Sequence, residues 1–591
     1  MVCVLFGYMV ELLISPLVLV GLMAAVYGWG RLVFPGGDWS GRYGAGALAV
    51  YALVAILGWI GLLRPAFLWV VAAVGLASVI ARPGSLLPKG WKAVLAAALI
   101  LLPLAALPPF SRDAMNHHLF LPRLWLENGA LFRPAWAKFF SFPYLVESLQ
   151  ALVGGTAGLR FGRLVSLSGL LASVACVSRI AGGGRRGAAA AVVLLSIPEL
   201  LRNGTWAFAD TYLVLFSLLA LKDLSKGEAP PWRPLLWASA AACCKYNGAI
   251  LIPLVALALL MKRRSWSRRD VGLSLAAVAL PALTWALPNL IQWGNPVYPR
   301  LAGIFGGIER SARAEALLAD FRAYTASLRG VEDLLLLPVR MSMSGQWDNP
   351  RLFDGSSGPL LLAGLVLSLI ISRRRRVELW LPLAYIVLAQ AVLGPVVRVR
   401  YLLPGLAMLS VRAAGGLLDA ARRGRAATLL IGGLAAVCLI WSGSWLVRLY
   451  GISRPWSYRN DSQYLEEMVP YMEFYRECGE VLESGSVTLL VNLGNRAYYF
   501  PGDVRFDAER FPMTLLEKFW RDMSAEDVAE ELREAGITHI ALNINYTVDN
   551  LFVELDAAQR SQCSILIRRY ARPLVIRPPY GLLRLEEVSE P

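Results

Sequence analysis

Long apolar blocks alternate with short polar links along most of this chain of 591 residues. Several blocks approach the roughly 20 residues that a helix needs to cross about 30 Å of hydrocarbon, and they lack the period-two alternation of a half-buried strand. Because a helix satisfies its own backbone hydrogen bonds in lipid, the pattern predicts a bundle of transmembrane helices. The expected spans are residues 12–33, 44–63, 65–81, 92–107, 160–179, 187–201, 206–221, 234–260, 270–291, 358–372, 377–394, 400–418 and 426–447.

Clusters of Lys and Arg orient these spans, because cytoplasmic loops of membrane proteins are enriched in both residues. The links RIAGGGRR (179–186), SRRRR (372–376) and ARRGR (421–425) are therefore expected inside. A single crossing by the block 234–260 would place the basic run MKRRSWSRR outside, so we expect two half-spans that turn at residues 243–248. The total is about 14 crossings, counting the half-spans, with both chain ends outside.

The chain divides into two parts of different character. Residues 1–449 form the predicted helix bundle, with long external loops at about 108–159 and 294–357. From residue 450 the apolar runs become short, and SVTLLVNLG and THIALNI fit strands around the helical stretch SAEDVAEELREAG, which has a Ser N-cap and a Gly after its end. We expect residues 450–591 to be a small soluble α/β domain on the extracytoplasmic side.

Composition supports a membrane protein, with 57% hydrophobic and 17% charged residues. The net charge of +16 would suggest a nucleic-acid partner in a soluble protein, but here the basic residues cluster between apolar blocks, so we expect membrane lipids and no nucleic acid. The first residues, MVCVLFGYMVE, lack the basic n-region of a cleaved signal peptide. The seven cysteines show no CxxC spacing, and Cys478 and Cys563 in the tail either form a disulfide or stay free.

Candidate chemistry gathers where the predicted spans meet the outer face. Asp113 and two of the three histidines in the protein lie just after the fourth span, and acids and cations from later spans reach the same face. Lys and Arg are natural partners of phosphate, so this face suits an anionic head group whose lipid tail lies between helices. The residues are Asp113, His117, His118, Asp210, Lys245, Tyr246, Arg398, Arg400 and Tyr401.

An ordered set of motifs resembles the polytopic glycosyltransferases of the GT-C fold, especially bacterial relatives of protein O-mannosyltransferases and of the lipid A aminoarabinose transferase. The motifs cover most of residues 108–405. In order they are RDAMNHHLFLPRLWLENG, FSFPYLVESL, FADTYLVLF, CCKYNGAILIPL, GNPVYP and VRYLLP.

The resemblance implies a catalytic acid in the first external loop, at Asp113, and a donor sugar linked to a polyprenyl phosphate. It implies that basic residues hold the donor phosphate at Lys245 and Arg400, with Arg398 and Tyr401 beside them. Many relatives carry a second acid after the first, where this chain has Ala114, and an Asp-x-x-x-x-His pattern gives a role to His118.

Further substrate contacts are expected from the remaining candidates, His117, Asp210 and Tyr246. Relatives with monophosphate donors usually work without a metal, so no cofactor is expected, although a divalent metal is not excluded; a metal touching Asp113 would contradict this expectation.

The residue types suit sugar transfer. A phosphate leaves as a stable anion and needs cations, which Lys245 and Arg400 supply, while the attacking acceptor must lose a proton. Asp113 can take that proton, with His118 orienting or sharing it, and direct displacement with one base predicts inversion at the sugar carbon. The acceptor stays open between protein, lipid and glycan.

Each candidate also has a structural interpretation. Asp113 can pair with a neighbouring Arg, Lys245 can reach the lipid interface from a helix end, Asp210 can pair with another helix, and Arg398 can anchor the interface. Adjacent His117 and His118 point about 100° apart on an α-helix, so only one is expected to face the site. Glu147 is expected to be structural.

Two other classes of function remain open. A transporter or flippase for a lipid-linked saccharide would line its path with the same residue types, but near mid-membrane. A non-catalytic component of a polysaccharide assembly machine would not depend on Asp113. Because the ionisable residues cluster at one face, the sequence favours a membrane glycosyltransferase acting at the outer face of the bacterial cytoplasmic membrane.

Overall fold

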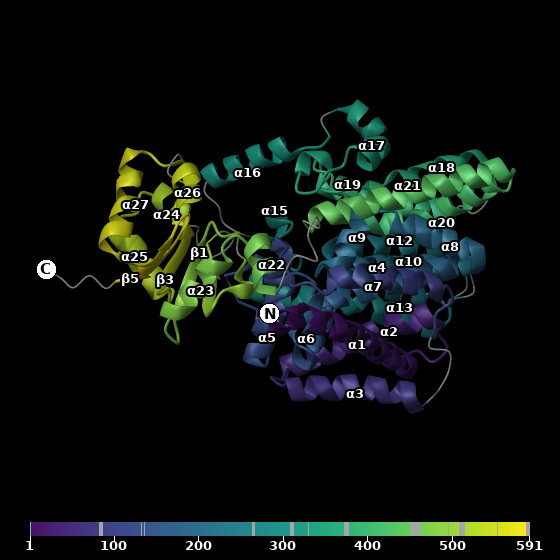
Figure 1. Ribbon diagram of the computed structural model, residues 1–591, viewed down its shortest axis with the longest axis horizontal. Coiled ribbons are helices and arrows are strands. Elements are labelled where there is room, and N and C mark those ends of the chain that lie inside the picture. The colour runs from purple at the N-terminus through teal and green to yellow at the C-terminus, as the bar shows by residue number, and fades with distance from the viewer. Residues whose placement is uncertain are drawn as a thin grey trace.

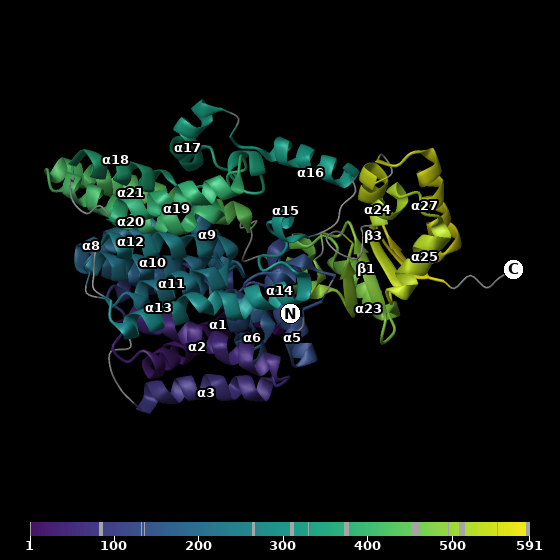
Figure 2. The same cartoon turned by 180° about the vertical axis from the view of Figure 1, so that it is seen from behind.

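A computed structural model shows a bundle of helices with roughly parallel axes and a smaller mixed unit at one end (Figures 1 and 2). The structure describes residues 2–81, 87–131, 133–134, 136–227, 229–262, 266–307, 312–328, 330–371, 377–450, 461–494, 496–507, 515–551 and 554–586.

The bundle and its loops contain helices α1 to α21. Their bounds are α1 (Val2–Val33), α2 (Trp39–Trp59), α3 (Pro65–Ala81), α4 (Trp91–Ala105), α5 (Phe120–Asn128), α6 (Leu145–Thr156), α7 (Arg163–Ile180), α8 (Gly184–Leu195), α9 (Pro198–Thr205), α10 (Asp210–Lys226), α11 (Trp232–Cys244), α12 (Leu251–Met261), α13 (Arg268–Pro281), α14 (Leu287–Trp293), α15 (Ala302–Phe305), α16 (Ala312–Thr325), α17 (Val331–Met343), α18 (Pro359–Ile371), α19 (Val377–Leu393), α20 (Val399–Ala421) and α21 (Arg425–Leu449).

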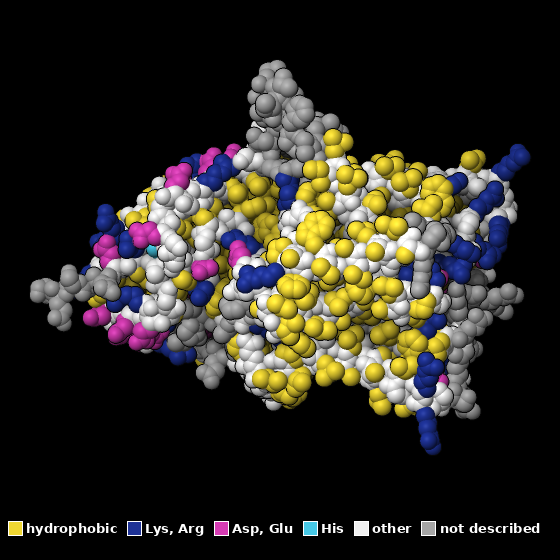
Figure 3. Space-filling model, turned by 90° about the horizontal axis from the view of Figure 1, so that it is seen from below, with side chains coloured by type: hydrophobic (Ala, Val, Ile, Leu, Met, Phe, Trp, Pro, Cys, Tyr) yellow, Lys and Arg dark blue, Asp and Glu magenta, His cyan; other side chains and the backbone are white. Residues whose placement is uncertain are grey.

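Six helices of the described chain are long and apolar enough to cross a membrane. They are Leu12–Val33, Trp39–Trp59, Leu159–Ile180, Arg268–Trp293, Val399–Ala421 and Arg425–Leu449. Shorter apolar helices pack among them, and apolar side chains cover the flank of the bundle in Figure 3. The protein is therefore a multi-pass membrane protein with a mainly helical fold, as the apolar blocks predict.

One expected span is wrong. The block 187–201 is not a single crossing but two short helices, because α8 ends at Leu195 and α9 begins at Pro198. Proline has no N–H for the helical ladder and Ile197 before it is extended, which ends one helix and starts the next. Helix α9 then bends by 119° into α10.

The two predicted half-spans are confirmed. Helix α11 ends at Cys244, a 3₁₀ turn, η4 (Tyr246–Ile250), follows, and α12 packs back along α11. After α12, the Lys262 ammonium donates to the carbonyl of Leu224 in α10, close to the start of α11. Helix α11 therefore begins, and helix α12 ends, at the same end of the bundle. Residues 263–265 and 372–376, which belong to the basic runs used to orient the chain, lie outside the described residues.

The C-terminal unit is built around a five-stranded sheet of order β2-β1-β3-β5-β4. Strands β1, β2 and β3 are parallel, and β5 pairs antiparallel with β3 and β4. The predicted strands and helix are confirmed, and Ser524 caps α25 in a capping box with Asp527. The elements are α22 (Asp461–Met468), α23 (Met472–Val481), β1 (Val487–Val491), β2 (Asp503–Phe506), α24 (Leu515–Trp520), α25 (Ala525–Glu534), β3 (His539–Asn543), α26 (Ile544–Tyr546), α27 (Ala557–Arg569), β4 (Ala571–Arg577) and β5 (Tyr580–Leu585).

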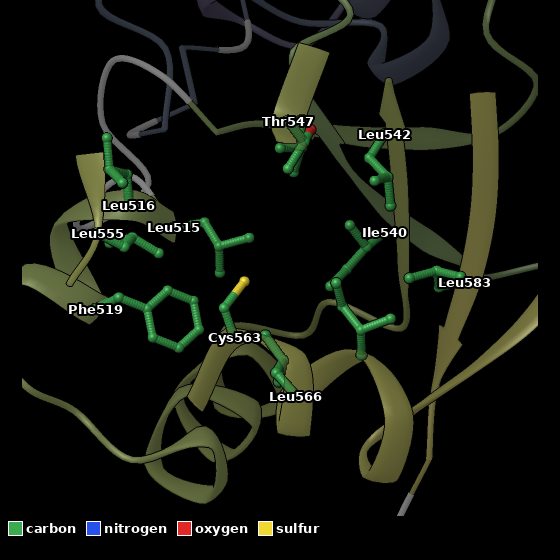
Figure 4. A pocket seen from close by; sticks show the side chains of 12 residues that line it. Leu515, Leu516, Phe519, Ile540, Leu542, Thr547, Leu555, Cys563, Leu566 and Leu583 are labelled. Carbon is green, nitrogen blue, oxygen red and sulfur yellow. The ribbon is translucent and has the colours of Figure 1, made fainter. Parts of the chain in front are cut away.

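The two faces of this sheet belong to different hydrophobic cores. Leu490 of β1 packs into the core that continues through the bundle, whereas its neighbours Leu489 and Val491 pack against α24, α25 and α27. Figure 4 shows the second core, whose cavity of about 30 Å³ is lined almost entirely by apolar side chains. Cys478 lies in the first core and Cys563 in the second, and both are free thiols, so the disulfide left open by the sequence is absent.

Candidate active site at one end of the bundle

The loop after α4 forms a π-helical turn that sets the position of the first candidate residues. Asp113 precedes the turn η1 (Ala114–His118), whose i→i+5 hydrogen bond runs from the N–H of Leu119 to the carbonyl of Ala114. The wider turn brings the rings of His117 and His118 to a centroid distance of 4.7 Å, and both side chains are buried. The two rings thus lie side by side, and the expectation that only one of them faces the site stays a prediction.

Asp113 forms an ion pair with Arg400, the second residue of α20. A guanidinium nitrogen of Arg400 lies 2.6 Å from a carboxylate oxygen of Asp113, while 37% of the Asp113 side chain stays accessible. Burial on its own would raise the pKa of the Asp113 carboxyl, but Arg400, with His118 and Lys245 further away, holds that pKa below its usual range. Asp113 is thus ionised and reachable.

A second ion pair lies beside the first. Lys245, directly after α11, donates to both carboxylate oxygens of Asp210 at 2.8 and 2.9 Å, and Asp210 is buried at the start of α10. The Lys245 ammonium lies 5.1 Å from the ring centroid of Tyr401, whose hydroxyl is 3.3 Å from Arg400. Tyr401 therefore joins the two ion pairs into one cluster at the ends of three helices.

Two candidates point elsewhere. Arg398 faces Asp354 at 3.8 Å instead of Asp113. The Tyr246 hydroxyl lies 2.6 Å from the carbonyl oxygen of Tyr298 and 3.0 Å from that of Ser141, so it connects the loop before α6 to the segment after α14. The substrate contact expected for Tyr246 stays a prediction.

Glu147 is the residue whose place the sequence interpretation missed. It lies in the first turn of α6, is fully buried, and has a carboxylate oxygen 2.5 Å from Nδ1 of His118 and 4.0 Å from Nδ1 of His117. Burial and the neighbouring His118 ring lower the pKa of His117 well below 6.5, which keeps His117 neutral. The sequence did contain a signal, since Glu147 is an acid within an apolar helix of the same segment, 108–159.

Comparison with known proteins identifies the fold. No family model and no curated protein matches the sequence. Two solved structures of ArnT from Cupriavidus metallidurans superpose on it with TM-scores of 0.54, for the form bound to undecaprenyl phosphate, and 0.50, for the apo form. Each is 13% identical and the match covers 84% of this chain and 98% of ArnT. The chain has the GT-C fold. An Archaeoglobus fulgidus oligosaccharyltransferase matches less well, with 14% identity over 82% of this chain and 72% of its own, at a TM-score of 0.41.

Within this GT-C fold, the C-terminal unit closes over the loop that carries Asp113. Arg112 donates to the carbonyl of Gly494 at 3.2 Å, and the Tyr499 hydroxyl donates to the carbonyl of Pro109 at 2.7 Å. Arg123 of α5 donates to the carbonyl of Tyr498 at 3.0 Å. The segment before β2 is thus fastened on both sides of Asp113.

Proposed function

We propose that this protein is a glycosyltransferase that moves a sugar from a polyprenyl-phosphate carrier to a protein, lipid or glycan acceptor. The observation that carries the proposal is the ionised, accessible Asp113 held 2.6 Å from Arg400, next to the pair of Lys245 and Asp210. The structure of ArnT with undecaprenyl phosphate supports a lipid-linked donor for a chain of the same fold.

The cations of the site suit the leaving group. Without donor, Arg400 and Lys245 are each paired with a carboxylate, Asp113 and Asp210. A donor phosphate attracts the same cations through charge-assisted hydrogen bonds, and as the phosphate departs these interactions stabilise its growing charge.

Donor binding also changes the base. When Arg400 turns to the phosphate, the pKa of Asp113 rises toward its usual value and the carboxylate becomes a better proton acceptor. Asp113 then takes the proton of the acceptor hydroxyl or amine as it attacks, and His118 orients or shares that proton. The sugar carbon is inverted, because a single displacement occurs.

The side of the membrane follows from the charges. Lys and Arg side chains gather at the end of the bundle far from the C-terminal unit, where cytoplasmic loops are expected (Figure 3). The reaction then takes place at the outer face of the cytoplasmic membrane, and the C-terminal unit, which covers the Asp113 loop, helps to recognise the acceptor.

The transporter interpretation has weaker support. Asp210, Lys245 and Arg400 lie at helix ends and on the same end as the Asp113 loop, whereas a carrier places its ionisable residues near mid-membrane.

Replacement of Asp113 by Asn tests the proposal. A strain lacking the gene, complemented with wild type, Asp113→Asn or Glu127→Gln, is compared by mass spectrometry of its glycans, glycolipids and glycoproteins. Asp113→Asn should behave like the deletion, because loss of a general base costs about 10²–10⁴-fold in rate. Glu127 is an exposed acid that pairs with Arg123 within α5, the helix after the Asp113 loop. Glu127→Gln is the matched control, and this variant should restore the glycan. Full complementation by Asp113→Asn would overturn the assignment.

A further inference from the structure

Behind Asp113 lies a cluster of three metal-ligating side chains. His117 and His118 of η1 and Glu147 of α6 offer ligand atoms that all lie within 4.8 Å of one another. The three residues are buried, with side chains that are 8%, 10% and 0% exposed. Buried polar groups of this kind are costly unless they are fully satisfied.

Part of this cluster lacks a hydrogen bond. The second carboxylate oxygen of Glu147 is buried and has no hydrogen-bond partner among the described residues. One turn later on the same helix, the side-chain amide nitrogen and oxygen of Gln150 are also buried without a hydrogen-bond partner among the described residues. A cation held by both carboxylate oxygens of Glu147 would satisfy the second carboxylate oxygen as well.

The distances suit a small cation after minor adjustment. With metal–ligand bonds of 2.0–2.2 Å, neighbouring ligand atoms of a tetrahedral site lie about 3.4 Å apart. The other Glu147 oxygen, Oε1, is 2.5 Å from Nδ1 of His118 and 4.0 Å from Nδ1 of His117, one shorter and one longer than this value. Shifts of less than about 1 Å bring both to it.

The carboxylates around the cluster outnumber the cations, so the net charge favours binding of a further cation. Three carboxylates, Asp113, Glu147 and Asp210, lie near two cations, Arg400 and Lys245. A phosphodiester donor would add one more negative charge to this excess. A divalent cation balances the donor-bound site.

We propose that His117, His118 and Glu147 bind a divalent cation of the zinc class. Two imidazoles and one carboxylate form the donor set of zinc sites that keep a fourth position open. This differs from the metal-free site expected from the resemblance to GT-C enzymes. Only the contribution of the ion to charge balance rests on the proposed function; the binding itself does not.

Zinc binding by the full-length protein tests the site directly. The protein is purified in detergent with an affinity tag that contains no histidine, stripped with a chelator, and titrated with Zn²⁺ by calorimetry and by metal analysis after gel filtration. We expect one Zn²⁺ per chain. Binding of less than about 0.2 equivalents by the folded wild-type protein would overturn the proposal without any variant.

Variants locate the ion. Glu147→Gln and His118→Gln keep side-chain size and should weaken Zn²⁺ binding at least tenfold. His539→Gln, which replaces the third histidine of the chain in the C-terminal unit, should bind like wild type. Equal binding by Glu147→Gln and wild type would place the ion elsewhere and overturn the site.

The small number of histidines allows a second measurement on wild-type protein. Selective ¹⁵N labelling gives ring signals from three histidines only. Zn²⁺ should shift two of the three sets and leave the His539 set unchanged. If no set shifts, His118 and Glu147 share a hydrogen bond without a metal. Binding of undecaprenyl phosphate, measured separately on the stripped protein, reports on the proposed function and distinguishes its failure from that of the metal site.

Discussion

Asp113 and Asp210 each hold a cation that a lipid phosphate would also attract. Asp210 is fully buried and holds Lys245 with both oxygens, whereas Asp113 is partly accessible and meets Arg400 with one. Removing one partner of a buried ion pair leaves the other charge uncompensated, which costs more free energy of folding than the intact pair contributes. The structural and functional roles of Lys245 are therefore separable by experiment.

Lys245→Gln alone should destabilise the protein by about 3 kcal/mol, because it leaves the Asp210 carboxylate buried without its cation. The double variant Lys245→Gln with Asp210→Asn should recover most of that stability. Both variants should bind undecaprenyl phosphate at least tenfold more weakly than wild type. Thermal unfolding and native mass spectrometry measure the two properties. Wild-type lipid affinity in the double variant would show that Lys245 serves only to neutralise Asp210.

Helix ends and turns, more than helix bodies, build the site. Asp210 begins α10, Arg400 lies in the first turn of α20, and Lys245 lies in the turn between the half-spans α11 and α12. This turn needs close contact between its two arms. A Cβ on Gly248 would lie 2.1 Å from the carbonyl oxygen of Ala241, so no other residue fits there without backbone movement.

Gly248→Ala should therefore destabilise the protein by about 1–3 kcal/mol, the usual cost of forcing an extra carbon into a packed site, and should weaken lipid-phosphate binding by moving Lys245. Gly272→Ala in α13 is the matched control, because a Cβ there meets nothing within 4 Å. That control should be neutral or slightly stabilising, since Ala favours a helix more than Gly. Equal melting temperatures for both variants would contradict the close packing of the half-spans.

Two hydrophobic cores share one sheet, so the molecule does not divide simply into a bundle and a separate tail. The first core passes from the bundle to the inner face of the sheet, and the second lies between the outer face and α24, α25 and α27. Asp507, just after β2, accepts a hydrogen bond from the N–H of Leu515, the first residue of α24, and so connects the sheet to the outer helices. Burial raises the pKa of Asp507 to about 6.

The stability of the outer layer should therefore depend on pH. An acid with a higher pKa in the folded state binds its proton more tightly there, so its contribution favours folding below the ordinary pKa of 3.8 and is lost as the pH rises through about 6. Asp507→Asn removes this loss and should stabilise the outer layer by about 3 kcal/mol at pH 8 and by about half as much at pH 5. Hydrogen exchange of α24 and α27 measures the effect, with the exposed Asp503→Asn as control. A gain independent of pH would contradict this assignment.

The apolar blocks determined most of the bundle, because the length and hydrophobicity of a membrane helix are local properties of the sequence. The turn between the half-spans, the capped helix α25 and the strands β1 and β3 were predictable for the same reason. The break in the block 187–201 also had a local signal, Pro198, which favours extended backbone at Ile197 and is tolerated at the start of a helix.

Only the tertiary structure decided which candidate residues meet. Asp113 and Arg400 are 287 positions apart, and no local pattern specifies that pairing. The sequence analysis put His117 and His118 about 100° apart on an α-helix, because no local pattern predicts the π-turn, which depends on packing of the loop against α6 and the C-terminal unit. Glu147 acquired its place beside the histidines in the same way. The sequence thus determined which segments are long and apolar enough to cross a membrane, and the packing of distant helix ends determined which candidate residues meet.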